Sequence, residues 1–196
     1  MAFITQCFSL RGLALIAGAN IANALCNLFN VAFIAMGNAV GIITGQKLGA
    51  CDFENAKKDA VKLMRFSSLA SVSLTAILIA GARFFPLLYN TTDDVRQIGT
   101  MVIIIYALFF PVDGFLNALY FTLRSGGRTF ITFLFDSVFT WVLPVPLAFI
   151  LCRFTSLSAY LVLFILQSCS FVKMAVGLFM FHKDIWVQNL VEVKPN

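Results

Sequence analysis

Long apolar runs follow one another along this chain, and several of them contain no charged residue. Asp, Glu, Lys and Arg are absent from 13–46, 66–82 and 97–112. A helix needs roughly 17 to 25 predominantly apolar residues to cross the hydrocarbon core of a bilayer, so these runs are about as long as a span requires. The pattern predicts five membrane-spanning helices. We place them at 13–46, 63–88, 96–122, 129–152 and 156–181.

The composition argues against a water-soluble domain. Of the 196 residues, 60% are hydrophobic and 12% are charged, whereas an average soluble domain is about half apolar and about a quarter charged. Too few polar residues remain to enclose a soluble core. The expected fold is therefore all-α, a polytopic transmembrane helix bundle whose surroundings are the lipid bilayer.

The chain divides into three expected parts. Residues 1–12 are a remnant that precedes the first span, 13–181 form the five-helix transmembrane bundle, and 182–196 are a cytoplasmic tail. The charge pattern of 52–62 predicts a short interfacial helix that leads into the second span. The first residues lack the order of a signal peptide, so we expect the first apolar helix to direct its own insertion.

Lysine and arginine gather in the links after the first and third spans. Cytoplasmic links carry an excess of these residues. The basic residues in the two links are Lys47, Lys57, Lys58, Lys62, Arg65, Arg124 and Arg128. We expect a multi-pass protein of the cell membrane that begins outside and has a cytoplasmic C-terminus. This topology also explains the net charge of +5 without nucleic acid as a partner.

Asparagines form a stripe along the first span. Asn20, Asn23, Asn27, Asn30 and Asn38 fall within roughly 80° of one another on a helix of about 100° per residue. Amides that face lipid leave donors and acceptors unpaired, so the stripe must meet other helices or water. Two interpretations stay open: hydrogen bonds between helices, or the wall of a hydrated substrate cavity.

Glycines recur every four residues on the same span, at Gly37, Gly41, Gly45 and Gly49. Small residues at this spacing allow the backbones of two helices to approach closely. We expect a packing groove, which would also permit one helix to slide or bend against another.

A second polar face lies on the third span. Its members project within roughly 60° of one another on a helical wheel and are Tyr106, Asp113, Asn117, Tyr120 and Arg124. A carboxylate inside a membrane costs roughly 2.5 to 3.5 kcal/mol on insertion scales, which makes Asp113 a functional candidate. We expect it to couple an ion, with Tyr106, Asn117 and Tyr120 in a substrate cavity; the alternative is a structural partner for another helix.

Pro111 lies two residues before Asp113 and predicts a kink with unpaired backbone carbonyls. A carboxylate beside free carbonyls can hold a hard cation, so Asp113 is also a candidate ligand for Na⁺. A carboxyl group in a membrane can equally exchange a proton. Coupling to H⁺ and coupling to Na⁺ are both open.

The fourth and fifth spans carry fewer polar residues. Asp136 shares a face with several threonines, and it is either a structural acid paired with Arg124 or Arg128, or a second ion-coupling residue. Lys173 lies near the cytoplasmic end of the fifth span, where a long cationic side chain can reach the interface. We interpret it as an anchor.

Motifs for catalysis are missing from the sequence. The chain has one histidine, His182, and no HExxH, GxSxG, P-loop or Cys/His metal-binding spacing. We therefore expect neither an enzyme nor a bound cofactor.

Several segments, in order, resemble the C-terminal lobe of the multidrug and toxic compound extrusion (MATE) family. Gly41 to Ala50 reads GIITGQKLGA, close to the family's VGQxLGAG pattern after its eighth helix, although Cys51 stands where a glycine is expected. Leu123 to Thr129 reads LRSGGRT and resembles the LRxGG(D/K)T turn after the tenth helix. Trp186 to Leu190 reads WVQNL and resembles the closing WxxNL.

The resemblance implies a partial C-lobe of a twelve-helix fold, in a secondary active transporter that exports small organic, often cationic, compounds by H⁺ or Na⁺ antiport. It also implies a cation-coupling role for Asp113, which stands eleven residues before Arg124 as in some branches of the family. The N-terminal lobe is absent from the sequence. We expect it as a partner if the transporter is truncated or split; the further alternative is a decayed gene product. The alternatives are a lipid-linked oligosaccharide flippase of the same superfamily and a non-transporting membrane scaffold.

Overall fold

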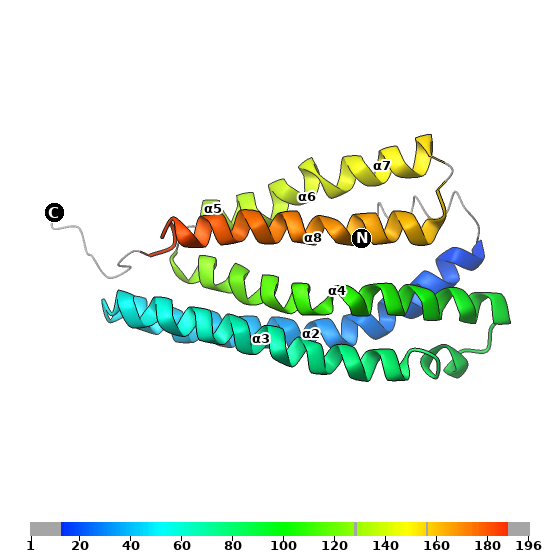
Figure 1. Cartoon of the computed structure of the whole chain (residues 1–196), viewed down its shortest axis with the longest axis horizontal. Helices are drawn as coiled ribbons and strands as arrows, with labels where there is room; N and C mark the ends of the chain where they lie inside the picture. Colours follow the sequence, from blue (N-terminus) through cyan, green and yellow to red (C-terminus); the bar gives the residue numbers. More distant parts are fainter. Residues whose placement is uncertain (1–12, 128, 156, 188–196) are drawn as a thin grey trace.

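The computed structural model describes residues 13–127, 129–155 and 157–187, and the regular elements in this part of the chain are all helices (Figure 1). The elements are α2 (Leu13–Gly49), α3 (Phe53–Gly81), the 3₁₀ helix η1 (Phe85–Leu88), α4 (Asp93–Ser125), α5 (Thr129–Phe133), the π-helix η2 (Leu134–Val138), α6 (Phe139–Val142), α7 (Pro144–Phe154) and α8 (Ala159–His182). Five stretches are long and apolar enough to cross a membrane, which confirms the predicted fold class.

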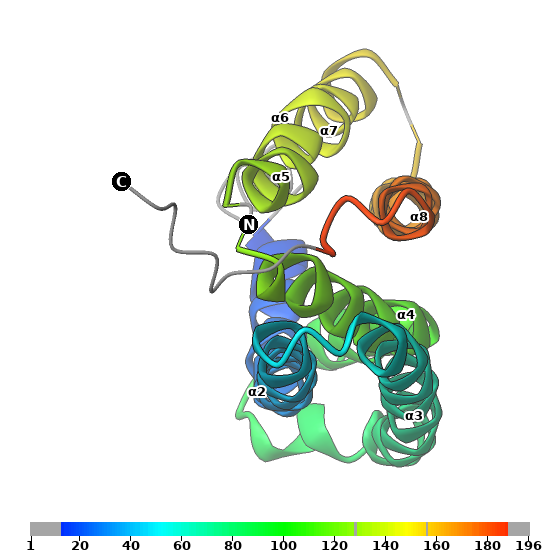
Figure 2. The same ribbon diagram turned by 90° about the vertical axis from the view of Figure 1, so that its left-hand side faces the viewer.

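The central element is α4, which packs against α2, α3 and α8. Figures 1 and 2 show α2, α3 and α4 side by side, while α8 lies on the other side of α4 next to the stretch from α5 to α7. In the apolar 18-residue stretch of α4, 56% of the residues are buried, against 11% in the corresponding stretch of Leu134–Phe154. The bundle therefore has α4 as its core, and the fourth span lies at its edge.

Glycines set the closest approaches to α4. A Cβ atom added at Gly37 would lie 2.4 Å from the ring of Phe121, and one at Gly114 would lie 1.7 Å from Oγ of Ser71. Gly41 also faces Phe121, whereas an added Cβ at Gly49 would meet nothing within 4 Å. The predicted groove on the first span is therefore a helix-packing surface, and it ends before Gly49.

Large apolar side chains cover the outer surfaces of the bundle. Examples on three different helices are Phe66 on α3, Phe149 on α7 and Phe171 on α8, each at least half exposed. Such a surface suits hydrocarbon, because lipid tails and not water are then the neighbours of these side chains.

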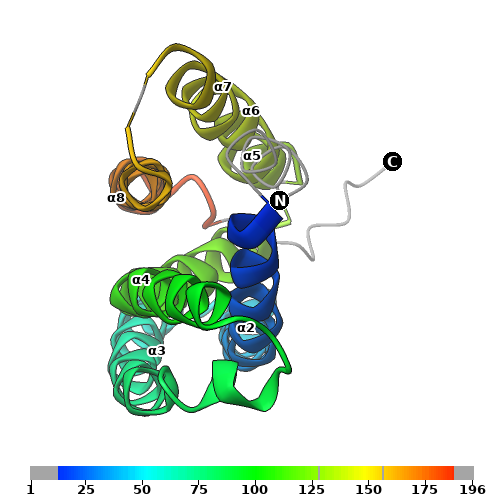
Figure 3. The ribbon, with the colours of Figure 1, turned by 90° about the vertical axis from the view of Figure 1, so that its right-hand side faces the viewer.

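The second span differs in its bounds from the expected 63–88. The segment 52–62 is not a separate interfacial helix, because Asp52 caps a helix that runs without a break from Phe53 to Gly81. Pro86 lacks the N–H that would bond to the carbonyl of Ala82, so the α-helix cannot continue through this proline, which instead lies in the first turn of η1. The short helix η1 then crosses the end of the bundle and contacts α2 and α4 (Figure 3).

The fourth span, expected as one helix over 129–152, has two irregular points. A π-helical turn occupies Leu134–Val138, and α7 starts anew at Pro144 after α6 has ended at Val142. Proline is accepted at the first position of a helix because its missing N–H would be unpaired there anyway. Single π-turns often occur at functional sites, and this one contains Asp136.

The helix α4 runs through Pro111 as one element from Asp93 to Ser125. The carbonyl that Pro111 leaves without its usual helical donor is that of Ala107, four residues earlier. The hydroxyl of Thr75 on α3 donates to this oxygen at 3.2 Å. The expectation of an unpaired carbonyl at this position, available to an ion, is therefore wrong, because a neighbouring helix supplies the donor.

Three links meet at one end of the bundle, on the left in Figure 1: the turn after α2, the turn after α4 and the residues after α8. Trp186 is fully buried there, with its ring stacked on Phe181 at 5.3 Å and its backbone oxygen against Gly126. Lys57 pairs with Asp184 at 2.6 Å. The links predicted to be cytoplasmic thus share one end, and their orientation in a cell stays a prediction.

Candidate functional site: a polar cavity inside the bundle

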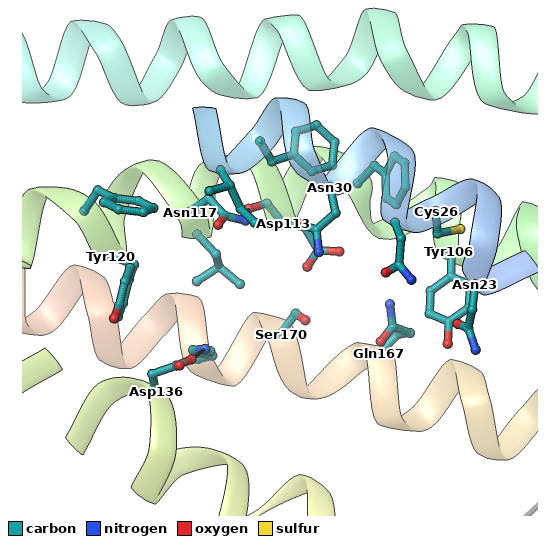
Figure 4. Close-up of a pocket in the computed structure, with 17 residues that line it drawn as sticks. Asn23, Cys26, Asn30, Tyr106, Asp113, Asn117, Tyr120, Asp136, Gln167 and Ser170 are labelled. Carbon is teal, nitrogen blue, oxygen red and sulfur yellow. Dashed lines mark hydrogen bonds and ion pairs between the residues drawn. The ribbon is translucent and has the colours of Figure 1, made fainter. Parts of the chain in front are cut away.

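A cavity of about 600 Å³ lies between α2, α4, η2 and α8 (Figure 4). Amide, hydroxyl and charged side chains face it beside aromatic rings. Its lining residues are Asn23, Cys26, Asn27, Asn30, Phe33, Ile34, Tyr106, Phe110, Asp113, Leu116, Asn117, Tyr120, Phe121, Asp136, Gln167, Ser170 and Lys173. A volume of this size can hold a drug-sized ligand.

The wall on α2 contains three residues of the predicted asparagine stripe, Asn23, Asn27 and Asn30. Asn20 is exposed outside the cavity, and so is Asn38. The stripe is longer than the cavity because α2 continues beyond it at both ends. The three central asparagines therefore fit the second of the two interpretations, the wall of a cavity.

The wall on α4 contains Tyr106, Asp113, Asn117 and Tyr120, all predicted to share one face. The Asn117 amide donates to the backbone oxygen of Asp113 at 3.0 Å, which fixes one side chain directly beside the acid. Arg124 lies on the same side of the helix but is exposed beyond the cavity. The helical wheel therefore identified the lining of this wall, but not where the cavity stops.

Asp136 is the second acid of the cavity, and it is paired with Lys173 of α8. The ammonium lies 2.7 Å from the carboxylate and 5.2 Å from the centre of the Phe135 ring. The expected partners were Arg124 or Arg128; Arg128 lies outside the described residues. Lys173 was expected to anchor α8 at the interface, and this interpretation is wrong because the side chain lines the cavity.

The third wall, on α8, was missed in the sequence. Gln167, Ser170 and Lys173 line the cavity, and both Ser170 and Lys173 interact electrostatically with Asp113. Their spacing of three residues was a usable signal, since residues three apart lie near each other on a helix. The sequence does not say which helix this polar side meets, and the structure places it opposite α4.

The cavity combines charged and hydrogen-bonding side chains. Its charged lining consists of two carboxylates and one ammonium, with amides and phenols around them. Among the described residues, no three His, Cys, Asp or Glu side chains gather as they would around a transition metal. A hard cation at Asp113 would draw its other ligands from amide, hydroxyl or carbonyl oxygens.

A bundle of five long apolar helices with a polar, acid-bearing cavity inside it defines a polytopic membrane protein of the kind that moves solutes. Comparison with known families agrees with this class. The family model for MatE matches residues 1–150, more than half of the chain, and the chain therefore belongs to the MatE family. Membership implies a transporter of the MATE type, and members of this family are not enzymes. No curated protein and no solved structure matches the chain.

Proposed function

We propose that this chain forms part of the C-terminal lobe of a multidrug exporter, in which H⁺ or Na⁺ entering at Asp113 is exchanged for an organic, often cationic, compound. The observation that carries the proposal is the position of Asp113. It lies on the central helix, in a cavity with amide and aromatic walls, inside a bundle of long apolar helices.

The lining suits aromatic cations. Tyr106, Tyr120 and Phe110 are among its lining residues, and an aromatic ring attracts a cation over its face by roughly 0.5 to 2 kcal/mol. The asparagines of α2 add acceptors without adding charge. A flat organic cation can therefore balance Asp113 while its rings contact aromatic side chains.

Asp113 can serve either coupling ion. A carboxyl group in a low-dielectric cavity gains from binding a proton because its charged form is poorly solvated. The same carboxylate with nearby oxygens suits Na⁺. In both cases one cation is released when another binds, which is the exchange that an antiporter needs.

Charge separates this proposal from a flippase for lipid-linked oligosaccharides. A cavity for an anionic pyrophosphate carrier would be expected to contain several basic residues. Among the described residues that line this cavity, Lys173 is the sole base and is already paired with an acid. The acids outnumber the bases, which favours a cationic cargo.

Transport by this fold needs two helix bundles that move against each other around the site. The test therefore uses cells that lack their own exporters and produce this chain together with a six-helix N-terminal lobe. Export of ethidium is followed by fluorescence after a proton or sodium gradient is imposed. We expect the D113N variant to lose gradient-driven export. The matched control is D94N, which changes an exposed acid at the start of the same helix. Full export by D113N would contradict the proposal.

A further inference from the structure

Lys173 occupies an unusual place for a lysine in a membrane-spanning helix. It lies on α8, and its side chain is 21% exposed, whereas the side chain of its partner Asp136 is 55% exposed. The lysine is thus the more deeply buried member of the pair. A buried ammonium is costly unless a counter-ion and further contacts compensate it, and here Asp136 and the face of Phe135 supply both.

Two carboxylates compete for this one ammonium. Lys173 also interacts electrostatically with Asp113 across the cavity, but its contact of 2.7 Å is with Asp136. Lys173 thus neutralises Asp136. Among the described lining residues, Asp113 is then the carboxylate that has no basic side chain paired with it. The formal charge of the described lining, two acids and one base, is one net negative charge.

We propose that Lys173 is a specificity-determining residue: as a cation tethered to α8, it neutralises Asp136 and limits the cavity to organic solutes that carry a single positive charge. This inference rests on the proposed function and names its substrate class. A second positive charge on the solute would have no free carboxylate to meet, and it would lie close to the ammonium.

A purely structural role for the pair is the competing explanation, since η2 and α8 are in contact and the bond joins them. The two explanations differ in one readout. A structural bridge affects stability but does not discriminate solutes by charge, whereas a tethered cation changes the relative affinity for monocations and dications.

The test uses the full chain, purified in lipid nanodiscs, and a matched pair of dyes. Ethidium is a monocation, and propidium carries the same phenanthridinium ring with a second, quaternary charge. Dissociation constants are measured by fluorescence for the wild type and for K173M, K173R and the swapped variant D136K/K173D, with thermal melting to verify folding. The wild type is expected to prefer ethidium.

Removing the ammonium should change this preference. In K173M, the affinity for propidium relative to ethidium is expected to rise about tenfold. This is about the size of the repulsion that is lost between the second charge of propidium and the ammonium, at roughly 10 Å and an effective dielectric constant of about 20. K173R and the swapped variant keep the charge inventory and should retain the wild-type ratio. A wild-type ratio in a folded K173M, or a K173M-like ratio in the swapped variant, would overturn the inference.

A D113N variant separates this inference from the proposed function. If the wild type binds ethidium and D113N does not, the cation site at Asp113 is supported. An unchanged ratio of affinities in K173M then overturns the inference about Lys173 but leaves the proposed function standing. If the wild type binds neither dye, both proposals are overturned.

Discussion

The hydroxyl of Thr75 lies 3.2 Å from the backbone oxygen of Ala107 and donates to the carbonyl that Pro111 leaves without its helical donor. The same hydroxyl lies 2.9 Å from the oxygen of Ser71 on its own helix, so its proton is shared between two acceptors. In a membrane no water replaces such a bond. The proline on α4, two residues before the acid of the cavity, is therefore accommodated by a side chain of α3.

The first prediction concerns this hydrogen bond. The T75V variant keeps the shape of the side chain but removes the donor, and an unpaired buried acceptor costs about 1 to 3 kcal/mol. We expect a lower melting temperature in detergent than for T100V, which loses only a hydrogen bond within its own helix. In a P111A background, where residue 111 regains its N–H, the cost of T75V should fall. Equal losses for T75V and T100V would contradict this account.

The second prediction concerns the approach of α3 to α4 at Gly114. A Cβ atom there would lie 1.7 Å from Oγ and 2.8 Å from Cβ of Ser71, so G114A must push the two helices apart. Overpacking of this kind costs about 1 to 3 kcal/mol. We expect G114A to melt earlier than G49A, because an added Cβ at Gly49 meets nothing within 4 Å.

A compensating change identifies the cause. The S71G substitution removes both atoms that the new Cβ of G114A would strike. The double variant is expected to be less destabilised than the sum of the two single variants. Simple additivity would show that the clash with Ser71 is not what G114A changes.

The third prediction compares two contacts at the end of the bundle where the links meet. Trp186 is fully buried against Phe181, and truncation of a buried tryptophan costs about 3 to 5 kcal/mol. The ion pair of Lys57 and Asp184 is about half exposed, and such pairs contribute about 0 to 1 kcal/mol. We expect W186A to expose the end of α8 to limited proteolysis and K57Q to leave the cleavage pattern unchanged. Rapid cleavage of K57Q would mean that the salt bridge, and not the indole, holds this end.

Much of the fold could be predicted from the sequence, because membrane spans follow from the length of apolar runs and polar faces follow from helical periodicity. Tyr106, Asp113, Asn117 and Tyr120 were placed together in this way, and all four line the cavity. The start of α3 was missed, because the sequence was divided where its charges end. Asp52 caps a single helix that includes both the charged and the apolar part.

The residues on α8 could not be predicted, for a different reason. Periodicity places Gln167, Ser170 and Lys173 near one another, but only tertiary packing places them opposite Asp113. The position of Lys173 near a helix end made an interfacial anchor the simplest interpretation. A long side chain can turn either way, and a carboxylate on a neighbouring span decided its direction. The π-turn around Asp136 likewise has no clear signal in the sequence.

The central claim is that one cation leaves Asp113 when a cationic solute binds. Its most direct test is to add ethidium to the purified protein, once in weakly buffered solution to record proton release and once with radioactive sodium to record displacement. We predict that the wild type and D94N release close to one H⁺ or Na⁺ per bound ethidium and that D113N releases none. Equal release by D113N and the wild type would contradict the assignment of Asp113 as the coupling residue.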